Sequence, residues 1–365
     1  GKAEAANLEA VMRFEIDQQN EPNLVTKIIS TLTEIISDVR LVVDDWTPMR
    51  NKLVSIIDTL ECQQLPLAEQ DIAENIAFLR WVANNHFTFI GYRSYGLRQD
   101  PITGLCELTP KKGTGLGSFR DDNCSADSLL PSTLSLHNSD LALKNNMLVM
   151  TKSTSRSTVH RPVNFDYLGL KRFDAQGNVI GEDRFFGLYS SAAYTARIDE
   201  IPLLRRKAQD LRDRIEQLPN SHKGKALQHI LNSYPRDEML QANVDELYPI
   251  IRGILQTQER HHLRLFLRLD TFGRFATALV YVPRERFNTA FRIKMQNILM
   301  HEFDGSSVDF NVMFSEQPLA RVQLTVHGKD IDNTAFDIND IEQQMRDAML
   351  AWNDHLHLAL NNKQG

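Results

Sequence analysis

Residues 262 to 283, HLRLFLRLDTFGRFATALVYVP, decide the fold of the C-terminal part of this chain. Apolar and polar residues alternate on both sides of the turn at Thr271 to Gly273, which is the pattern of two strands joined by a hairpin. A helix is predicted from Arg284 to about Phe303, followed by strands in VDFNVMFSE (308 to 316) and ARVQLTVHG (320 to 328). This order predicts a ferredoxin-like antiparallel sheet with a helix on one face.

The preceding stretch, residues 86 to 195, carries a second set of strand signals. HFTFIGYRSYGL, MLVMTKSTSR and FDYLGLKRF are rich in aromatic and β-branched residues that alternate with polar ones. DAQGN, Asp174 to Asn178, is typical of a hairpin turn between two such strands. The stretch therefore predicts a second, mainly antiparallel sheet.

Helical spacing of apolar residues dominates the rest of the chain. A strand in residues 9 to 17 is expected to lead into a helix that starts near Asn23, and two further amphipathic stripes over residues 46 to 83 predict a helical hairpin. Helices are also predicted between residues 196 and 257. A last helix, 338 to 361, has an apolar stripe with no evident partner in its own segment.

Composition excludes several classes of protein. With 365 residues the chain is long enough for two or three domains, and 42% hydrophobic and 24% charged residues are ordinary for a globular protein. A net charge of -6 argues against a nucleic-acid binder. The sequence has no long uncharged apolar run and no signal peptide, so it predicts neither a membrane protein nor a secreted one. The three cysteines have no CxxC spacing, which fits a cytoplasmic protein. Because no Met precedes Gly1, we expect an excised segment.

The motifs that usually carry chemistry are missing. Gly113 to Gly117 is the nearest approach to a dinucleotide-binding loop, but it lacks the third glycine and follows Pro110 and two lysines where a buried strand is needed. The histidine pairs 261/262 and 355/357 do not share a face at strand or helix spacing, and no G-x-S-x-G elbow is present. We therefore predict no catalytic, cofactor-binding or metal site in this chain.

The most suggestive stretch is LVMTKSTSRSTVHRP, residues 148 to 162. If all of it is extended, the two-residue period places on one face Lys152, Thr154, Arg156, Thr158 and His160. Cations with hydroxyls suit an anionic ligand, a carboxylate or the acidic surface of a partner. The candidate effector- or anion-binding residues are thus Lys152, Arg156, His160 and Arg161.

Two readings of this basic face remain open. Polar strand faces are common in antiparallel sheets, so the same residues also fit a solvated face. They equally fit an internal set of salt bridges to Asp166, Asp174 or Glu182. The basic cluster Arg205 to Lys207, with Arg197, Arg212 and Arg214 nearby, poses the same choice between gripping a neighbouring domain or subunit and forming a solvated helix face.

Long strings spread over most of the chain resemble the N-terminal half of the large bacterial NAD-specific glutamate dehydrogenases. The strings are FLRWVANNHFTFIGYRSY (78 to 95), GLGSFR (115 to 120), LVMTKSTSRSTVHRPVNFDYLGLKRFD (148 to 174), RFFGLYSSAAY (184 to 194), IPLLRRK (201 to 207) and HKGKALQHILNSYPRDEML (222 to 240). DVRLVVDDWTPMR (38 to 50) is similar to the link after that family's first ACT-like domain. The resemblance implies an α+β chain in which antiparallel ACT-like and PAS-like domains are joined by helical connectors.

On that basis the chain divides into six expected segments. They are the end of a first ACT-like domain (1 to 45), a helical linker (46 to 85), a PAS-like domain (86 to 195), a helical connector (196 to 257), a second ACT-like domain (258 to 330) and a C-terminal helix (331 to 365). The resemblance implies that the glutamate site and the NAD-binding fold of the parent enzyme lie beyond residue 365. NAD is then a cofactor of the parent enzyme and not of this chain.

Two functions follow from the resemblance. The first is a non-catalytic regulatory and oligomerisation segment, whose partners are other domains and subunits of the same homo-oligomeric enzyme. The alternative is a module that senses an amino acid or an anionic effector. ACT domains often carry a glycine-bearing turn between the first strand and a helix, whereas Asp270 to Gly273 joins two strands, and this difference favours the first function.

Overall fold

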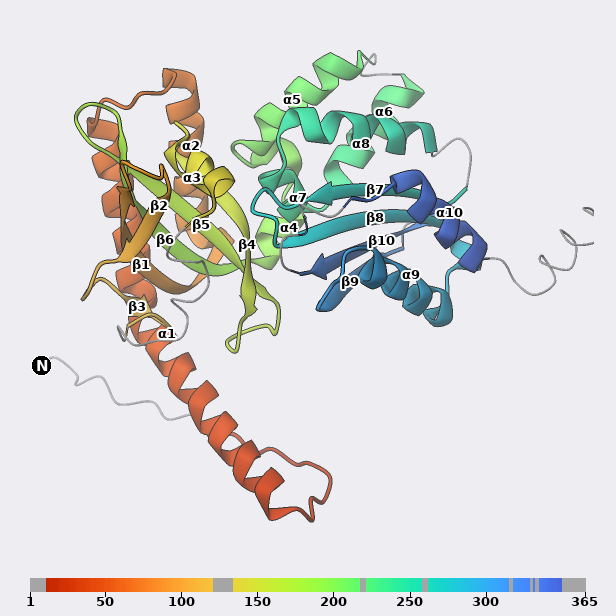
Figure 1. Cartoon of the computed structure of the whole chain (residues 1–365), viewed down its shortest axis with the longest axis horizontal. Helices are drawn as coiled ribbons and strands as arrows, with labels where there is room; N and C mark the ends of the chain where they lie inside the picture. The colour runs from red at the N-terminus through yellow and green to blue at the C-terminus, as the bar shows by residue number, and fades with distance from the viewer. Residues whose placement is uncertain are drawn as a thin grey trace, which may run out of the picture.

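The computed structural model describes residues 11–120, 134–216, 221–257, 262–314, 318–328, 331 and 335–349. Two antiparallel sheets lie side by side, with helices between and around them (Figure 1). Mixed helices and antiparallel sheets confirm the predicted α+β class.

Helix α1 (Pro22–Cys62) is 41 residues long and continues through Pro48. The sequence predicted a first helix and then a separate stripe from Trp46, so the predicted division between residues 45 and 46 falls inside one helix. The end of α1 packs on the first sheet through Met49 and Leu53, whereas its N-terminal half projects away from the rest of the chain (Figure 1).

The strand predicted in residues 9 to 17 is wrong over its described part. Residues 11 to 20 form neither helix nor strand, and Val11 and Phe14 are 95% and 63% exposed. Alternation marks a sequence that suits a strand, but a strand exists only when a neighbour accepts its backbone hydrogen bonds. No described strand pairs with this segment.

The first sheet has the strand order β2-β1-β6-β5-β4, with the short β3 also paired to β1. Its strands are β1 (Phe87–Gln99), β2 (Cys106–Pro110), β3 (Leu116–Gly117), β4 (Leu148–Arg156), β5 (Asn164–Phe173) and β6 (Val179–Tyr189). The predicted turn joins β5 to β6, where the Asp174 carboxylate accepts from the backbone N–H groups of Gln176 and Asn178. The antiparallel sheet expected between residues 86 and 195 is therefore present.

Several helices precede, interrupt and follow this sheet in the chain. Before it come α2 (Glu69–Trp81) and a π-turn (Val82–His86), and α3 (Leu136–Leu143) lies between β3 and β4. After it come α4 (Ser191–Thr195), a 3₁₀ turn (Ile198–Glu200), α5 (Leu204–Ile215), α6 (His222–Ser233), α7 (Arg236–Gln241) and α8 (Val244–Thr257).

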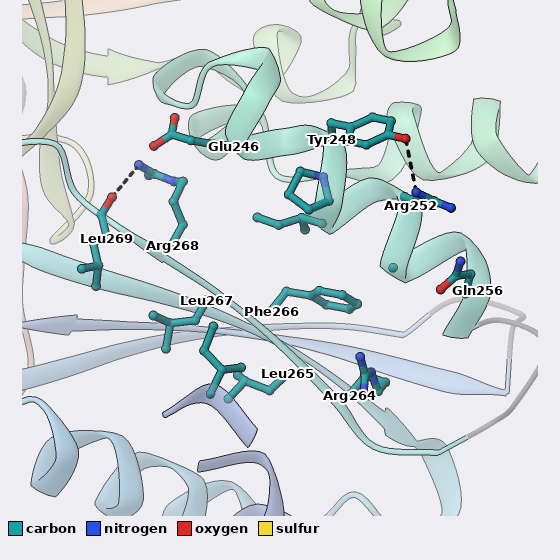
Figure 2. Close-up of a pocket in the computed structure, with 14 residues that line it drawn as sticks. Glu246, Tyr248, Arg252, Gln256, Arg264, Leu265, Phe266, Leu267, Arg268 and Leu269 are labelled. Atoms are coloured by element: carbon teal, nitrogen blue, oxygen red, sulfur yellow. Dashed lines mark hydrogen bonds between the residues drawn. The ribbon is translucent and has the colours of Figure 1, made fainter. Parts of the chain in front are cut away.

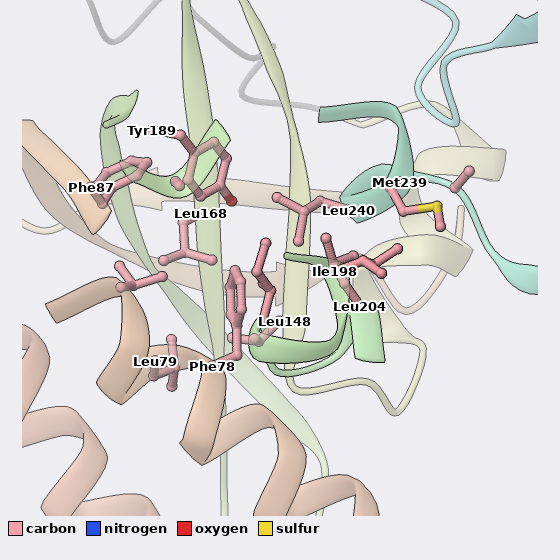
Figure 3. Packing of buried hydrophobic residues seen from close by; sticks show 14 of the residues in the cluster. Phe78, Leu79, Phe87, Leu148, Leu168, Tyr189, Ile198, Leu204, Met239 and Leu240 are labelled. Atoms are coloured by element: carbon pink, nitrogen blue, oxygen red, sulfur yellow. The ribbon is translucent and has the colours of Figure 1, made fainter. Parts of the chain in front are cut away.

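One hydrophobic core joins the sheet to these helices. Figure 3 shows Phe78 and Leu79 of α2 near Leu168 of β5, with Leu204 of α5 and Leu240 of α7 in the same cluster. These side chains are at most 4% exposed. The helical connector is thus packed on the sheet and is not a free linker.

The second sheet has the order β7-β8-β10-β9. It consists of β7 (Arg264–Leu269), β8 (Phe275–Pro283), β9 (Ser307–Met313) and β10 (Leu319–His327), with a 3₁₀ turn (Arg284–Arg286) and α9 (Thr289–Glu302) between β8 and β9. Asn288 caps α9 by accepting from the N–H of Phe291, as asparagine does at helix starts.

Helix α10 (Ile338–Met349) packs on the second sheet's domain, which supplies the partner that its apolar stripe lacks in its own segment. Ile341 and Met345 are fully buried in the core that α9 shares with the second sheet. The Glu342 carboxylate also accepts from the backbone N–H of Leu265 at the edge strand β7. The described part of this helix is therefore part of the second sheet's domain, and residues 350 to 361 of the prediction lie outside the described residues.

Candidate interdomain junction and cleft

Helix α7 lies between the two sheets and begins with three charged residues, the buried Arg236 and Glu238 and the partly buried Asp237. The Arg236 guanidinium donates to carbonyl groups of the connector, including those of Ala196 and Asn232 at 3.0 and 2.8 Å. Consecutive positions on a helix point in different directions, so three neighbouring charges reach three different parts of the fold. The other two face one sheet each.

Asp237 faces the first sheet and meets Lys152 of β4. The Lys152 Nζ lies 2.7 Å from the Asp166 carboxylate and 3.0 Å from that of Asp237. Although burial alone lowers it, the two carboxylates hold the pKa of Lys152 above its usual value. Burial raises the pKa of Asp166 despite Lys152. For Asp237 burial also acts to raise the pKa, but the charge of Lys152 and several hydrogen bonds together outweigh it and lower the pKa. Lys152 is therefore a charged bridge between the first sheet and α7.

Glu238 faces the second sheet. Its carboxylate accepts from Arg268 Nε of β7 at 2.6 Å and from the Thr277 hydroxyl of β8 at 2.9 Å. The side chains of Arg268 and Glu238 are only 5% and 4% exposed. A charged pair so far from water needs its partners, because an unpaired buried charge is very costly.

A third polar link joins the sheets directly. The Thr151 hydroxyl of β4 donates to Asp270 at 3.0 Å, and Arg274 forms a salt bridge with the same carboxylate at 2.9 Å. Asp270 and Gly273 close the turn between β7 and β8, since the Gly273 N–H donates to the Asp270 carbonyl. The contacts between the two units therefore include several charged and polar pairs.

Beside this junction lies a cleft of about 470 Å³ between the first sheet and the strands β9 and β10. Lys152, Arg156 and Arg161 line one side, and Asp309 and His327 line the other. The Asp309 carboxylate lies 3.3 Å from Arg156 Nη2 and 3.2 Å from His327 Nε2. Burial lowers the pKa of His327 in spite of Asp309, so this imidazole is neutral at pH 7.

The structure distributes the four candidate binding residues unequally. Lys152, Arg156 and Arg161 line the cleft, whereas His160 is exposed, has a φ of 72° and is not among the lining residues. The single polar face expected over 152 to 160 does not extend that far, because β4 ends at Arg156 and a bend follows. Beyond the strand the two-residue period no longer applies, and the Thr158 hydroxyl donates to Asp38 of α1.

Sequence reasoning missed the partners of these residues. Asp166 was named as one salt-bridge candidate for the basic stretch, and it does bond Lys152. The other predicted partners do not: Asp174 caps its own turn and Glu182 pairs with Arg184. Asp237 is 85 positions from Lys152 along the chain, so no local pattern could link them. The only signal in the sequence was three adjacent charges in an otherwise apolar stretch, YPRDEML.

The basic cluster at Arg205 to Lys207 grips a neighbouring helix of the same chain. Arg205 and Arg206 form salt bridges with Glu74 and Asp71 of α2. Lys207 points inward, where its Nζ donates to the carbonyls of Met239, Leu240 and Ala242 at 2.8 to 3.0 Å. Because it is buried, the pKa of Lys207 is lowered to about 8.

The glycine-rich stretch does not fit a dinucleotide phosphate. The Gly117 N–H donates to the Asp45 carboxylate of α1 at 2.7 Å, and Arg120 pairs with the same carboxylate at 2.7 Å. Its backbone donor is therefore occupied by an anion of the chain itself. The stretch fastens β3 to α1.

A second hollow of about 670 Å³ lies between α8 and the edge strand β7 (Figure 2). Figure 2 shows Tyr248 and Arg252 of α8 above Phe266 and Leu267 of β7. Arg268, which lines it, is bonded to Glu238 and to the Leu269 carbonyl. Most of its charged groups thus already have partners, and the interdomain cleft is the better candidate site.

Within the described residues, no group of three or more potential metal ligands occurs and no helix is long and apolar enough to cross a membrane.

Two family models match adjoining stretches in the C-terminal part of the chain. A family model described as glutamate dehydrogenase, helical motif 1, matches residues 201–260. Another, glutamate dehydrogenase, ACT2 domain, matches residues 264–353 and so includes α10.

Three relatives are each named NAD-specific glutamate dehydrogenase. The protein of Halomonas elongata is 34% identical over 95% of this chain and 22% of its own length, and that of Pseudomonas aeruginosa is 32% identical over 95% and 21%. The protein of Mycobacterium tuberculosis is 26% identical over 87% of this chain and 18% of its own length. The chain spans about a fifth of the relatives it matches. It therefore belongs to the NAD-specific glutamate dehydrogenase family, as a segment that contains helical motif 1 and the ACT2 domain.

Proposed function

We propose that this chain is a non-catalytic regulatory and assembly segment of a cytoplasmic, homo-oligomeric NAD-specific glutamate dehydrogenase. The parent enzyme would convert L-glutamate and NAD to 2-oxoglutarate, ammonia and NADH, with NAD bound outside this chain. The observation that carries the proposal is the α7 junction. Asp237 and Glu238, one residue apart, tie the first sheet and the ACT2 domain into one body.

Such a junction suits a segment that fixes the orientation of one sheet relative to the other. Lys152, Asp237, Glu238 and Arg268 are all largely buried, so a rotation of one sheet relative to the other would expose or unpair charged groups. Unpairing a buried charge costs several kcal/mol, roughly 3–5 by analogy with other buried pairs. The junction would therefore hold one relative orientation and resist intermediate ones, as a rigid spacer or a two-state element must.

The projecting half of α1 supports a role in assembly. Its apolar side chains include Ile29, Ile36 and Val39, which are 60%, 39% and 37% exposed. We propose that residues 1 to 45 belong to a first ACT-like domain whose sheet covers this face, and that residues 86 to 195 form the PAS-like domain of the family. An exposed apolar stripe of this length is typical of a surface that another domain covers.

An effector-sensing module is the second candidate, and the interdomain cleft favours it. The cleft is of a size common for small-molecule sites, roughly 300–1,000 Å³, and it brings charged residues of both units together. A ligand there would contact the first sheet and the ACT2 domain at once. This arrangement would couple its binding to their relative orientation.

The proposal is tested with the full-length parent enzyme and with a version that lacks residues 1 to 365. We expect the shortened enzyme to change its oligomeric state in light scattering or lose its response to effectors. This chain alone should not turn over glutamate with NAD. Turnover by this chain, or a shortened enzyme with unchanged assembly and unchanged effector response, would overturn the proposal.

A further inference from the structure

The Asp309 carboxylate marks a position in the interdomain cleft where an anion is bound by groups from both units. Arg156 belongs to β4 of the first sheet, and His327 belongs to β10 of the ACT2 domain. Their nitrogens lie 3.3 and 3.2 Å from the two oxygens of Asp309. A carboxylate from the chain itself thus shows which chemistry this spot accepts.

This internal contact is one that a ligand can replace. The side chains of Arg156 and Asp309 are 61% and 45% exposed, so the pair is at the rim of the cleft. Exposed ion pairs contribute little to stability because water screens them. Arg156 is also anchored independently, since its Nη2 donates to the Pro162 carbonyl at 2.9 Å. Asp309 can therefore turn away while the guanidinium stays in place.

One buried donor in the cleft wall, the Arg161 Nε, has no acceptor in the described part of the chain. Arg161 has one nitrogen bonded to the Tyr189 carbonyl at 2.8 Å, but its buried Nε has no hydrogen-bond partner. The buried Nδ1 of His327 also lacks a partner, but in the neutral imidazole Nε2 carries the proton that faces Asp309, so Nδ1 is an acceptor and cannot donate to an anion. Buried polar atoms are nearly always bonded, so the unpartnered Arg161 Nε beside the cleft indicates an acceptor that the described part of the chain does not provide.

Lys152 lines the cleft but is not available to bind such a ligand. Its charge is matched by Asp166 and Asp237, which lie within 3.0 Å. The cations that remain for an incoming group are the two arginines, whose planar forks suit the geometry of a carboxylate.

We propose that the interdomain cleft binds a small organic carboxylate through Arg156 and Arg161, and that Asp309 competes with it for Arg156. Binding would exchange the Arg156–Asp309 contact between the two units for contacts to the ligand. The inference rests on the proposed regulatory role only where it expects the ligand to change the activity of the parent enzyme. The binding itself is a property of this chain.

The test is calorimetric titration of the whole chain at low ionic strength with succinate, its neutral diamide and inorganic phosphate. We expect heat from succinate, little from phosphate and none from the diamide. Arg156→Gln should weaken succinate binding about tenfold, the worth of one charge-assisted hydrogen bond. Asp309→Asn should strengthen binding several-fold, because it removes the competing carboxylate. Arg98→Gln, an exposed arginine on β1 outside the cleft, is the matched control and should bind as the wild type does.

Each other result would count against the inference. Absence of succinate binding, equal binding of phosphate, or equal losses in Arg156→Gln and Arg98→Gln would overturn it. Weaker binding in Asp309→Asn would show that this carboxylate helps the ligand and would overturn the competition. If succinate binds as expected but leaves turnover of the full-length parent enzyme unchanged, the cleft is a carboxylate-binding site and the proposed sensing function is wrong.

Discussion

Replacing Glu238 by Leu should destabilise the interdomain junction more than any substitution of an exposed residue there. Arg268, 6% exposed, would keep only two neutral acceptors, the Leu269 carbonyl and the Gln241 side-chain oxygen, both at 3.2 Å. The Thr277 hydroxyl would lose its acceptor as well. Leaving one member of a buried ion pair without its partner costs about 3–5 kcal/mol in the free energy of unfolding.

Two companion variants separate the lost charge from the lost shape. Glu238→Gln keeps an oxygen acceptor for Arg268 and should cost less, roughly 1.5–3 kcal/mol, the worth of a hydrogen bond to a charged group. The double variant Glu238→Leu with Arg268→Met removes both charges and should recover most of the loss, because paired apolar replacements of buried ion pairs are often neutral.

The measurement is equilibrium unfolding in urea, with hydrogen exchange of β7 and β8 to localise the effect. Both strands carry the partners of Glu238, so their exchange should accelerate first. A cost below about 1 kcal/mol for Glu238→Leu would refute the reasoning, since the pair would then not be desolvated. A double variant as unstable as the single one would refute it too.

Three further predictions concern other parts of the chain. Lys207→Met should lower the free energy of unfolding by about 1–3 kcal/mol, because the carbonyls at the end of α7 lose their donor, and urea unfolding measures this. For His327 the folded pKa lies below the unfolded value of 6.5, so the stability that it contributes is present above pH 6.5 and is lost as the pH falls through the folded pKa. The variant His327→Gln should therefore flatten this part of the curve of stability against pH, which thermal unfolding measures. Gly117→Ala should lower the melting temperature, since a Cβ there would lie 2.2 Å from the Ile90 carbonyl oxygen at a φ of +62°, whereas Gly104→Ala has a similar φ of +71° with nothing within 4 Å and should cost only the backbone strain.

Contrary results would be equally clear for these three. An unchanged midpoint in Lys207→Met would mean that water replaces the lysine, and an unchanged acid limb in His327→Gln would assign the pH dependence elsewhere. Equal shifts for the two glycine variants would remove the argument for the close approach of β3 to β1.

Local patterns predicted the strands and helices wherever the neighbours they needed were close in sequence. The alternation on both sides of Thr271 to Gly273 gave β7 and β8, because a hairpin pairs strands that follow one another. The same alternation failed in residues 11 to 17, since no described strand lies beside them. Periodicity also divided α1 at Trp46, where the stripe passes from an exposed half to a half packed on the sheet.

The candidate site was predictable only in part, and the reason is distance along the chain. LVMTKSTSRSTVHRP identified Lys152, Arg156 and Arg161 because cations are visible in a sequence. Asp309 and His327 are about 150 and 170 positions further on and stood out in no motif. His160 was predicted on the assumption that β4 continued to it, but the strand ends at Arg156.

The sequence by itself determined the fold class, the strand-rich and helix-rich regions and the family, because hydrophobic periodicity and long shared strings are properties of the chain alone. Only the tertiary structure decided that α7 joins the two sheets, that α10 closes the ACT2 domain and that the basic stretch meets Asp237 and Asp309. Those results depend on which charges and apolar faces are brought together once the chain is compact. Pairing across 85 or 150 positions is set by packing, and packing leaves no local pattern in the sequence.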